Sequence, residues 1–148
     1  MIDVKVVGDK EVIEKYKRVA KKLPDNLYKA MLRLTLYLAG YVKTRKLTGQ
    51  SLKVRTGRLR NSITGKAQRI GNKIIGKVGT NVEYARIHEF GGDIYPKNAP
   101  YLRFQVNGQW VTTKHVKIPK RPYLQPSLKE NRDRILRDLG AAVNATIR

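Results

Sequence analysis

The sequence predicts an α+β fold: an antiparallel sheet of about four strands packed by two long helices, with short helices in the connections. Apolar residues recur at helical spacing near both ends of the chain, whereas two strand-like runs in the middle are bent at Gly71-Asn72 and Asn107-Gly108. The chain has 148 residues, 41% of them hydrophobic, and no cysteine. We therefore expect one globular domain over residues 1–148 that is held by its core rather than by disulfides.

The N-terminal third is predicted to be mainly helical. Residues 2–7 alternate well enough for a short strand, and Asp9 is placed to cap a helix that runs to about Leu23. Pro24 is expected to interrupt it, and a long helix follows over residues 25–46. Because that helix is apolar nearly all round, it should be buried on more than one side. The sheet can cover one side of this helix. The other side can be covered by the C-terminal helix or by a neighbouring copy of the chain, and we favour the C-terminal helix.

The middle and the C-terminal third alternate between short helices and hairpins. Thr56 resembles the N-cap of a helical turn over residues 57–62. In order, we then expect a hairpin of Thr64–Ile70 with Lys73–Gly79, a short helix of Glu83–Phe90 ended by Gly91-Gly92, a hairpin of Tyr101–Val106 with Gln109–Ile118, and a helix over about 125–147. Leu128, Ile135, Leu139, Ala142 and Val143 form the apolar stripe of this last helix.

Charge is concentrated in one part of the chain. The formal net charge is +21, from 32 bases and 11 acids, and residues 29–79 contain thirteen bases and no acid. Within this part we predict a long, exposed, basic loop over about 43–56. The basic candidates for contact are Lys43, Arg45, Lys46, Lys53, Arg55, Arg58 and Arg60. Two interpretations stay open: a solvated connection, or a surface that contacts phosphate or an acidic neighbouring subunit.

The residues that common active sites require are missing. His88 and His115 have no histidine at helical spacing, and without cysteine a zinc site would need carboxylates. We find neither a phosphate-binding glycine loop nor a nucleophile elbow. The sequence therefore predicts no catalytic site, no metal and no cofactor. The longest apolar stretch, Leu34 to Val42, is too short to span a bilayer, and no targeting signal is visible, so we expect synthesis in the cytoplasm and no membrane partner.

Four segments, in their order and spacing, carry a resemblance to a known family. They are a long helix followed by a basic loop, Val54–Ile63 with its Thr-Gly-Arg-Leu-Arg-Asn-Ser-Ile turn, Val78–Gly92 with its Tyr-Ala-Arg-Ile-His-Glu-Phe-Gly box, and Ile118–Leu128 with its Arg-Pro-Tyr-Leu-Gln-Pro run. Together they span about residues 25–147. In these segments the chain resembles the minor tail proteins of long-tailed bacteriophages, also called tail-component, tail-completion, neck or head–tail joining proteins.

Elementary physical roles can be assigned to the residues of these motifs. Thr56 caps, Gly57 permits a tight start, and Leu59 and Ile63 anchor the turn to the core. Tyr84, Ile87 and Phe90 share one helical face and should pin the short helix, which Gly91 ends. The remaining motif residues, His88, Glu89, Pro122, Tyr123 and Pro126, are also expected to make the fold rather than a catalytic site, the two prolines by stiffening the entry to the last helix.

The resemblance implies a structural virion protein. It would be a tail-completion or head–tail joining subunit that forms a ring, of six copies in the family, at the head-proximal end of the tail. Its partners would be copies of itself, a head-completion or connector protein, and the tail-terminator or tail-tube protein. It would reside in the virion tail or neck after assembly in the host cytoplasm, with genome DNA passing through the lumen.

Two alternatives stay open beside this interpretation. The basic 43–60 segment could make the chain a non-specific DNA-binding protein, since lysine and arginine contacts to phosphate need no base readout. The chain could also be a tail assembly factor that is absent from the mature particle. No pattern in the sequence sets the copy number of a ring.

Overall fold

The computed structural model describes residues 10–49, 52 and 56–148. The elements, in chain order, are α1 (Lys10–Tyr41), the π-helical turn η1 (Val42–Lys46), α2 (Arg58–Ser62), β1 (Thr64–Ile70), β2 (Lys73–Gly79), α3 (Ala85–Phe90), β3 (Gly92–Ile94), β4 (Leu102–Val106), β5 (Gln109–Thr113), β6 (Val116–Ile118), α4 (Leu124–Glu130) and α5 (Arg132–Ile147). The α+β prediction is confirmed. The strand expected over residues 2–7 and the cap expected from Asp9 lie outside the described residues.

The first two predicted helices are a single helix. The expected interruption at Pro24 is wrong, because α1 runs through it for 32 residues. Proline has a backbone angle that suits a helix, and what it removes is the hydrogen bond to the carbonyl four residues earlier. That carbonyl belongs to Ala20, and both Ala20 and Pro24 are exposed, so water can take the place of the missing donor. The helical end predicted at Lys46 is confirmed, with its last turn as η1.

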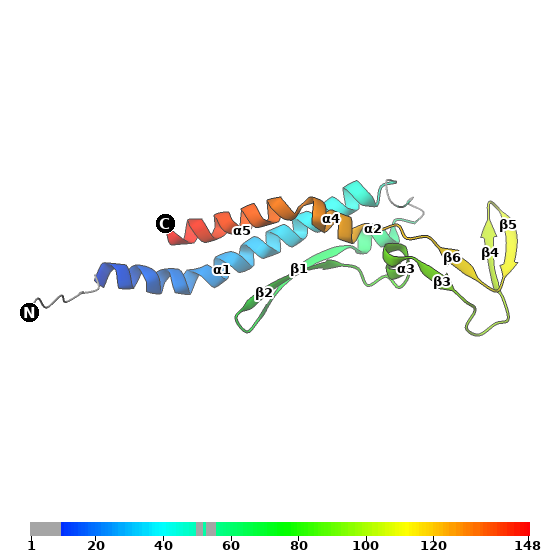
Figure 1. The fold of residues 1–148 in the computed structure, drawn as a ribbon, viewed down its shortest axis with the longest axis horizontal. Coiled ribbons are helices and arrows are strands. Elements are labelled where there is room, and N and C mark those ends of the chain that lie inside the picture. The colour runs from blue at the N-terminus through cyan, green and yellow to red at the C-terminus, as the bar shows by residue number, and fades with distance from the viewer. Residues whose placement is uncertain (1–9, 50–51, 53–55) are drawn as a thin grey trace, which may run out of the picture.

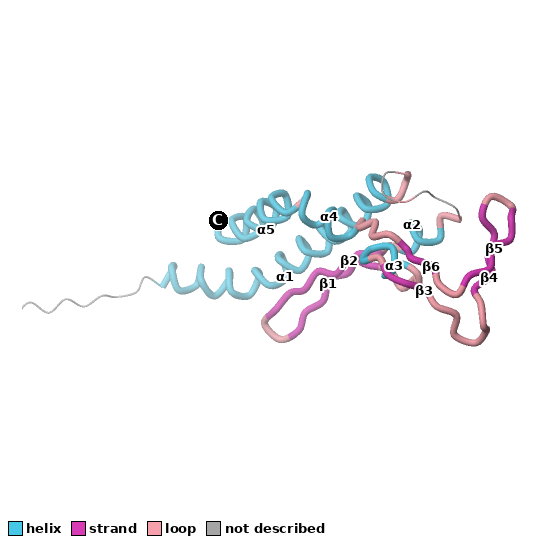
Figure 2. Tube along the Cα trace, turned by 45° about the vertical axis from the view of Figure 1, so that its right-hand side comes forward, coloured by secondary structure: helices cyan, strands magenta, loops and turns pink. Residues whose placement is uncertain are grey.

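The helix α1 forms the middle layer of the elongated body. It contacts the β1–β2 hairpin on one side and α5 on the other, an arrangement that Figure 1 and Figure 2 show from two directions. The predicted hairpin is confirmed, with Thr64 opposite Gly79 and Ile70 opposite Lys73. The second cover of the nearly all-apolar helix therefore comes from the same chain, as the sequence favoured.

The second predicted hairpin is only partly correct. Strands β4 and β5 pair around the Asn107-Gly108 turn as expected, but the strand does not continue to Ile118. The backbone N–H of His115 donates to the Thr113 hydroxyl at 3.3 Å, which turns the chain there. Residues 116–118 then pair with β3, in which Asp93 lies opposite Lys117. Within the described residues the strands thus form three separate antiparallel pairs rather than one four-stranded sheet.

The C-terminal helix is divided in two at Asn131. This residue is buried, and its side-chain amide donates to the Ser127 carbonyl at 2.8 Å. Its Oδ1 accepts from the Tyr37 hydroxyl of α1 at 3.0 Å. The continuous helix expected over 125–147 is therefore wrong, because a buried amide binds the backbone at the junction of α4 and α5 and ties it to α1.

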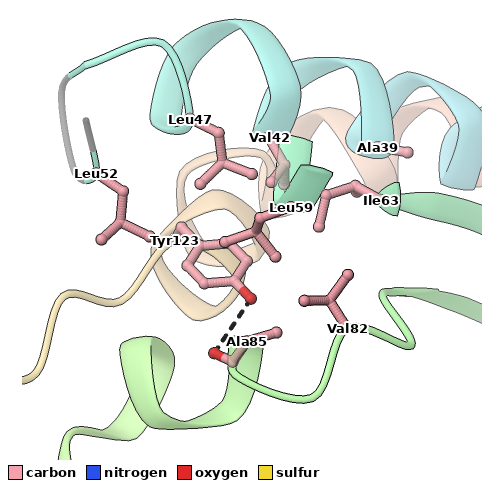
Figure 3. Packing of buried hydrophobic residues seen from close by; sticks show 9 residues of the cluster. All are labelled: Ala39, Val42, Leu47, Leu52, Leu59, Ile63, Val82, Ala85 and Tyr123. Atoms are coloured by element: carbon pink, nitrogen blue, oxygen red, sulfur yellow. Dashed lines mark hydrogen bonds between the residues drawn. The ribbon is translucent and has the colours of Figure 1, made fainter. Parts of the chain in front are cut away.

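The buried core gathers around the C-terminal end of α1 and η1. Figure 3 shows side chains from α1, η1, α2, α3 and the start of α4 converging there. The largest fully buried side chains are Tyr123, Ile63 and Val42, each with no exposed surface. The core is therefore at one end of α1, while the other end, residues 10–23, extends past the body (Figure 1). Among the described helices, none has a stretch of sufficient length and apolar character to cross a membrane.

Candidate functional site

The three motif segments around residues 56–63, 78–92 and 118–128 meet in space, although they are far apart in the sequence. Tyr123 is at their centre, and its hydroxyl donates to the Ala85 carbonyl of α3 at 3.3 Å (Figure 3). Leu59 and Ile63 pack into the same cluster, as predicted for the anchors of the turn. We call this meeting point the motif junction. It explains why the three motifs occur together: each supplies one side of one core.

The motif turn forms the short helix that the sequence predicted, but its N-cap is Gly57 and not the expected Thr56. Gly57 has a φ of 72°, in the left-handed region that suits glycine. The Thr56 hydroxyl accepts the N–H of Arg58 at 3.3 Å, and α2 begins at that residue. The threonine hydroxyl thus accepts the hydrogen bond of the first N–H group of the helix, which has no acceptor within the helix. The capping position itself is occupied by Gly57.

Glu89 joins α3 to α4 through its buried carboxylate. The residue is 4% exposed, and the carboxylate accepts three consecutive backbone N–H groups, those of Tyr123 at 2.7 Å, Leu124 at 2.9 Å and Gln125 at 2.8 Å. These groups open α4, and the first N–H groups of a helix have no partner within it. A carboxylate there also meets the positive end of the helix dipole. Glu89 is therefore a helix cap supplied from elsewhere in the chain.

The buried face of α3 differs from the predicted one. Tyr84, Ile87 and Phe90 were expected to pin this helix, yet Phe90 is 64% exposed and Tyr84 is 38% exposed. The buried residues are Ala85 and Glu89, which are four positions apart and share the opposite stripe. The reason is the cap: the carboxylate must face inward to reach α4, which turns the aromatic stripe outward.

Gly91 and His88 fix the exit of α3. Gly91 has a φ of 71°, and its N–H donates to the Ile87 carbonyl at 2.8 Å, so it ends the helix as predicted. A Cβ there would come within 2.9 Å of the Lys120 nitrogen. The His88 carbonyl accepts the N–H of Arg121 at 2.8 Å. Burial, together with the charge of Arg121, lowers the pKa of His88, so the ring is neutral at pH 7.

The two prolines of the motif frame the entry to α4. Pro122 is half-buried beside Tyr123. Pro126 occupies the first turn of α4, where a missing N–H costs no intrahelical hydrogen bond. The stiffening role predicted for them is consistent with these positions.

The basic candidates do not form one uniform surface. Lys46 is bound: its ammonium lies 2.6 Å from Glu130, which also accepts the Tyr41 hydroxyl at 2.7 Å. Both hydrogen bonds lower the pKa of Glu130, that from Lys46 most. Arg45 and Arg58 are exposed and have no ion pair within the described part of the chain, whereas Lys43 and Arg60 are half-buried. Lys53 and Arg55 lie outside the described residues, as does much of the predicted basic loop, while its start at 43–46 is helical.

A large groove opens beside the motif junction. It has a volume of about 1100 Å³ and lies between α1, the β1–β2 hairpin, α3 and α4. Its lining includes Leu34, Leu38, Val82 and Leu124, and at its edge Phe90 and Leu128. Phe90 is 64% exposed and Leu128 54% exposed, so the core is open on this side. Leu128 was expected in the buried stripe of the last helix, and the split at Asn131 places it at the groove instead.

A second uncovered apolar feature is the β4–β5 hairpin, which we call the arm (residues 102–113). Among the described elements it makes no substantial contact except between its own strands, and Figures 1 and 2 both show it standing clear of the body. One face carries Leu102, Phe104, Val106 and Val111, and the other carries Trp110 with Arg103 stacked on its ring at 4.6 Å. The sequence predicted that this hairpin belongs to a sheet covered by the long helices. That prediction is wrong, because no other described element packs substantially against β4 or β5.

Titration of Tyr123 gives a test of the motif junction. Burial, aided by the charge of Glu89, raises the pKa of Tyr123 to about 12. The unfolded chain ionises this phenol near pH 10 and the folded chain does not, so its contribution to stability is complete below pH 10 and is lost as pH rises towards 12. We expect the free energy of unfolding of Tyr123→Phe to fall less between pH 10 and 12 than that of the wild type, as measured by urea unfolding. Equal slopes would contradict a buried, neutral phenol.

Metal binding finds no support in the described part of the chain. There, no group of three or more histidine and acidic side chains is arranged to hold an ion. His115 instead lies 2.6 Å from Asp93 and stacks on Tyr95 at 4.9 Å, at the base of the arm. His88 lies in α3, whereas His115 lies between β5 and β6, so the two histidines belong to different elements, as the sequence predicted.

Comparison with known proteins identifies a family. Residues 17–144 match the phage virion morphogenesis family. The matched part includes most of α1, the motif junction, the groove and the arm. A search of curated proteins found no match, and a search of solved structures found none either.

Proposed function

The chain belongs to the phage virion morphogenesis family, and from that premise we propose that it is a structural subunit of the tail: a tail-completion or head–tail joining protein that forms a ring at the head-proximal end. The observation that carries this proposal is the amount of apolar surface left uncovered. Phe90, Leu128 and Trp110 are all more than half exposed, and so are Tyr16 and Leu36 of α1 and Leu136 of α5. Phe90 and Leu128 adjoin the apolar lining of the groove, and exposed apolar surface of this kind marks protein–protein contact.

Such a subunit acts through its surfaces and performs no reaction. Its neighbours would be copies of itself and the ring-forming proteins of the connector and tail above and below. A closed ring of copies needs two different surfaces on each chain, because a head-to-tail contact joins one patch to another. The arm and the groove are two such surfaces, and the exposed Arg45 and Arg58 suit an acidic neighbour or DNA in the lumen.

Counting copies in purified particles tests this function directly. Quantitative mass spectrometry would compare this chain with the tail-tube protein. A small fixed number, equal to one ring, is expected for a joining subunit. Absence from mature particles would remove the structural role and favour an assembly factor.

Charge reversal tests the basic surface. We expect Arg45→Glu with Arg58→Glu to reduce the yield of joined particles about tenfold or more, because opposed charges at an interface become like charges. Both side chains are exposed, so the fold should persist by circular dichroism. The matched control is Arg132→Glu with Arg137→Glu on α5, which makes the same change in net charge at other exposed arginines. Equal yields from the two double variants would show that the η1–α2 surface has no special role.

Non-specific DNA binding is favoured by one observation, the two exposed arginines without an ion pair in the described residues. Duplex DNA titrated at near-physiological salt would distinguish it. Affinity of about micromolar or tighter, with a steep loss on adding salt, is expected for a DNA-binding protein. Weak binding would leave the arginines to a protein neighbour.

A further inference from the structure

We propose that the arm of one copy docks in the groove of the next, and that this contact joins neighbouring subunits. The inference rests on the proposed ring and adds the surfaces that hold it together. Both surfaces are apolar, both are uncovered, and they have opposite shapes: the arm projects, and the groove is a hollow of about 1100 Å³. One chain that carries both can bind another copy head to tail, with every arm and every groove used in a closed ring.

The arm requires a partner for physical reasons. A lone two-stranded hairpin is marginally stable in water, and three strands or a packed face are needed for independent stability. Here Val106 is 47% exposed and Val111 is 36% exposed on the apolar face, and no other described element makes a substantial contact with the arm. Covering this face by a neighbouring copy would supply the missing packing.

The groove of the same chain cannot be reached by its own arm. The arm lies beyond β3 and β6, at the end of the molecule, and stands clear of the body in both views. The groove lies on the opposite side of α3, between α1, β1–β2 and α4. Its volume of about 1100 Å³ and its mainly apolar lining give room for the side chains of a polypeptide segment.

Charge also favours the arm as the occupant. A chain with a net charge of +21 repels its own copies over most of its surface. The arm is an exception, because residues 102–113 carry only one charge, Arg103, and that side chain is stacked on Trp110. The groove is lined by Lys66, Lys77 and Arg86 as well as by apolar residues. The apolar face of the arm carries no charged residue, so it can approach these cations with less repulsion than the rest of this strongly positive chain.

Disulfide trapping tests the contact, since the chain has no cysteine of its own. The double variant Val106→Cys/Leu128→Cys places one thiol on the apolar face of the arm and one at the groove. Oxidation of assembled particles should give a ladder of covalently linked copies on a non-reducing gel, with its top band at the ring number. The matched control, Val106→Cys/Leu36→Cys, should give no ladder, because Leu36 is 55% exposed against 54% for Leu128 but does not line the groove.

The outcomes separate this contact from the proposed function. Particles that contain the double variant without a ladder would overturn the docking and leave the virion role intact. If the particles lack the chain, the virion role fails, and oxidation of the concentrated purified chain decides the docking: a ladder supports it and its absence overturns it. A ladder from Tyr16→Cys/Leu128→Cys, and none from the arm variant, would assign the groove to the N-terminal part of α1 and also overturn the proposal.

Discussion

Replacing Glu89 with glutamine is expected to lower the free energy of unfolding by about 3 kcal/mol. The buried carboxylate accepts three backbone N–H groups at the start of α4, two at Oε2 and one at Oε1. A glutamine side chain has the same shape but only one oxygen, so its amide NH₂ must face at least one of these donors. A buried N–H group without an acceptor has lost its hydrogen bond to water and gained none in the protein, which destabilises the folded state.

Urea unfolding followed by circular dichroism would measure the effect. The matched control is Glu83→Gln, which makes the same substitution at an exposed position just before α3 and should change stability by less than about 0.5 kcal/mol. If the two variants unfold at the same urea concentration, the carboxylate of Glu89 does not hold α4, and the motif junction would need another explanation.

Replacing Gly65 with alanine should destabilise the chain by about 3 kcal/mol, at the upper end of the range for overpacking. Gly65 lies in β1 directly against α1, and an added Cβ would overlap with the carbonyl of Thr35. Because the obstacle is helix backbone, no side-chain rotation can relieve it. The methyl group must push the hairpin away from α1 and so open the apolar contact between them.

Two other glycines of the same hairpin calibrate this result. At Gly79 an added Cβ meets nothing within 4 Å, so Gly79→Ala should be neutral within about 0.5 kcal/mol. At Gly76 an added Cβ meets the flexible Met31 side chain at 2.6 Å and the stiffer Thr35 methyl group at 2.7 Å. Because both are side chains and not helix backbone, Gly76→Ala should fall between the other two variants. Thermal unfolding of the three variants would rank them. A loss at Gly65 no greater than that at Gly79 would contradict the close approach of β1 to α1.

Local signals predicted local structure well. The Gly71-Asn72 turn and the alternation around it gave the β1–β2 hairpin with its bounds, and helical periodicity gave α1 to the end of η1. The errors arose where a non-local partner or solvent decided the outcome. Pro24 stays helical because the carbonyl it leaves without a donor is exposed, and residues 116–118 leave the second hairpin because β3 offers a different partner.

The candidate site was predictable in its residues but not in their roles. The motif residues around Glu89 and Tyr123 were singled out in the sequence, yet their spacing of 34 positions says nothing of a carboxylate that caps another helix. The basic residues were also identified, but the binding of Lys46 to Glu130 depends on how α4 returns to η1. The Asn107-Gly108 turn predicted the hairpin of the arm, but nothing in the sequence predicted its exposure or the groove, because exposure of an apolar residue is not encoded by its type.

By itself the sequence determined the fold class, the strong positive charge and most of the element boundaries, since these depend on neighbours along the chain and on composition. The tertiary structure alone decided which face of α3 turns inward, where the C-terminal helix divides, and which apolar surfaces stay uncovered. The physical reason is the same in each case. A buried carboxylate or amide must lie where backbone donors or acceptors from distant segments can form hydrogen bonds with it. The apolar side chains of the same element must then lie on its other faces.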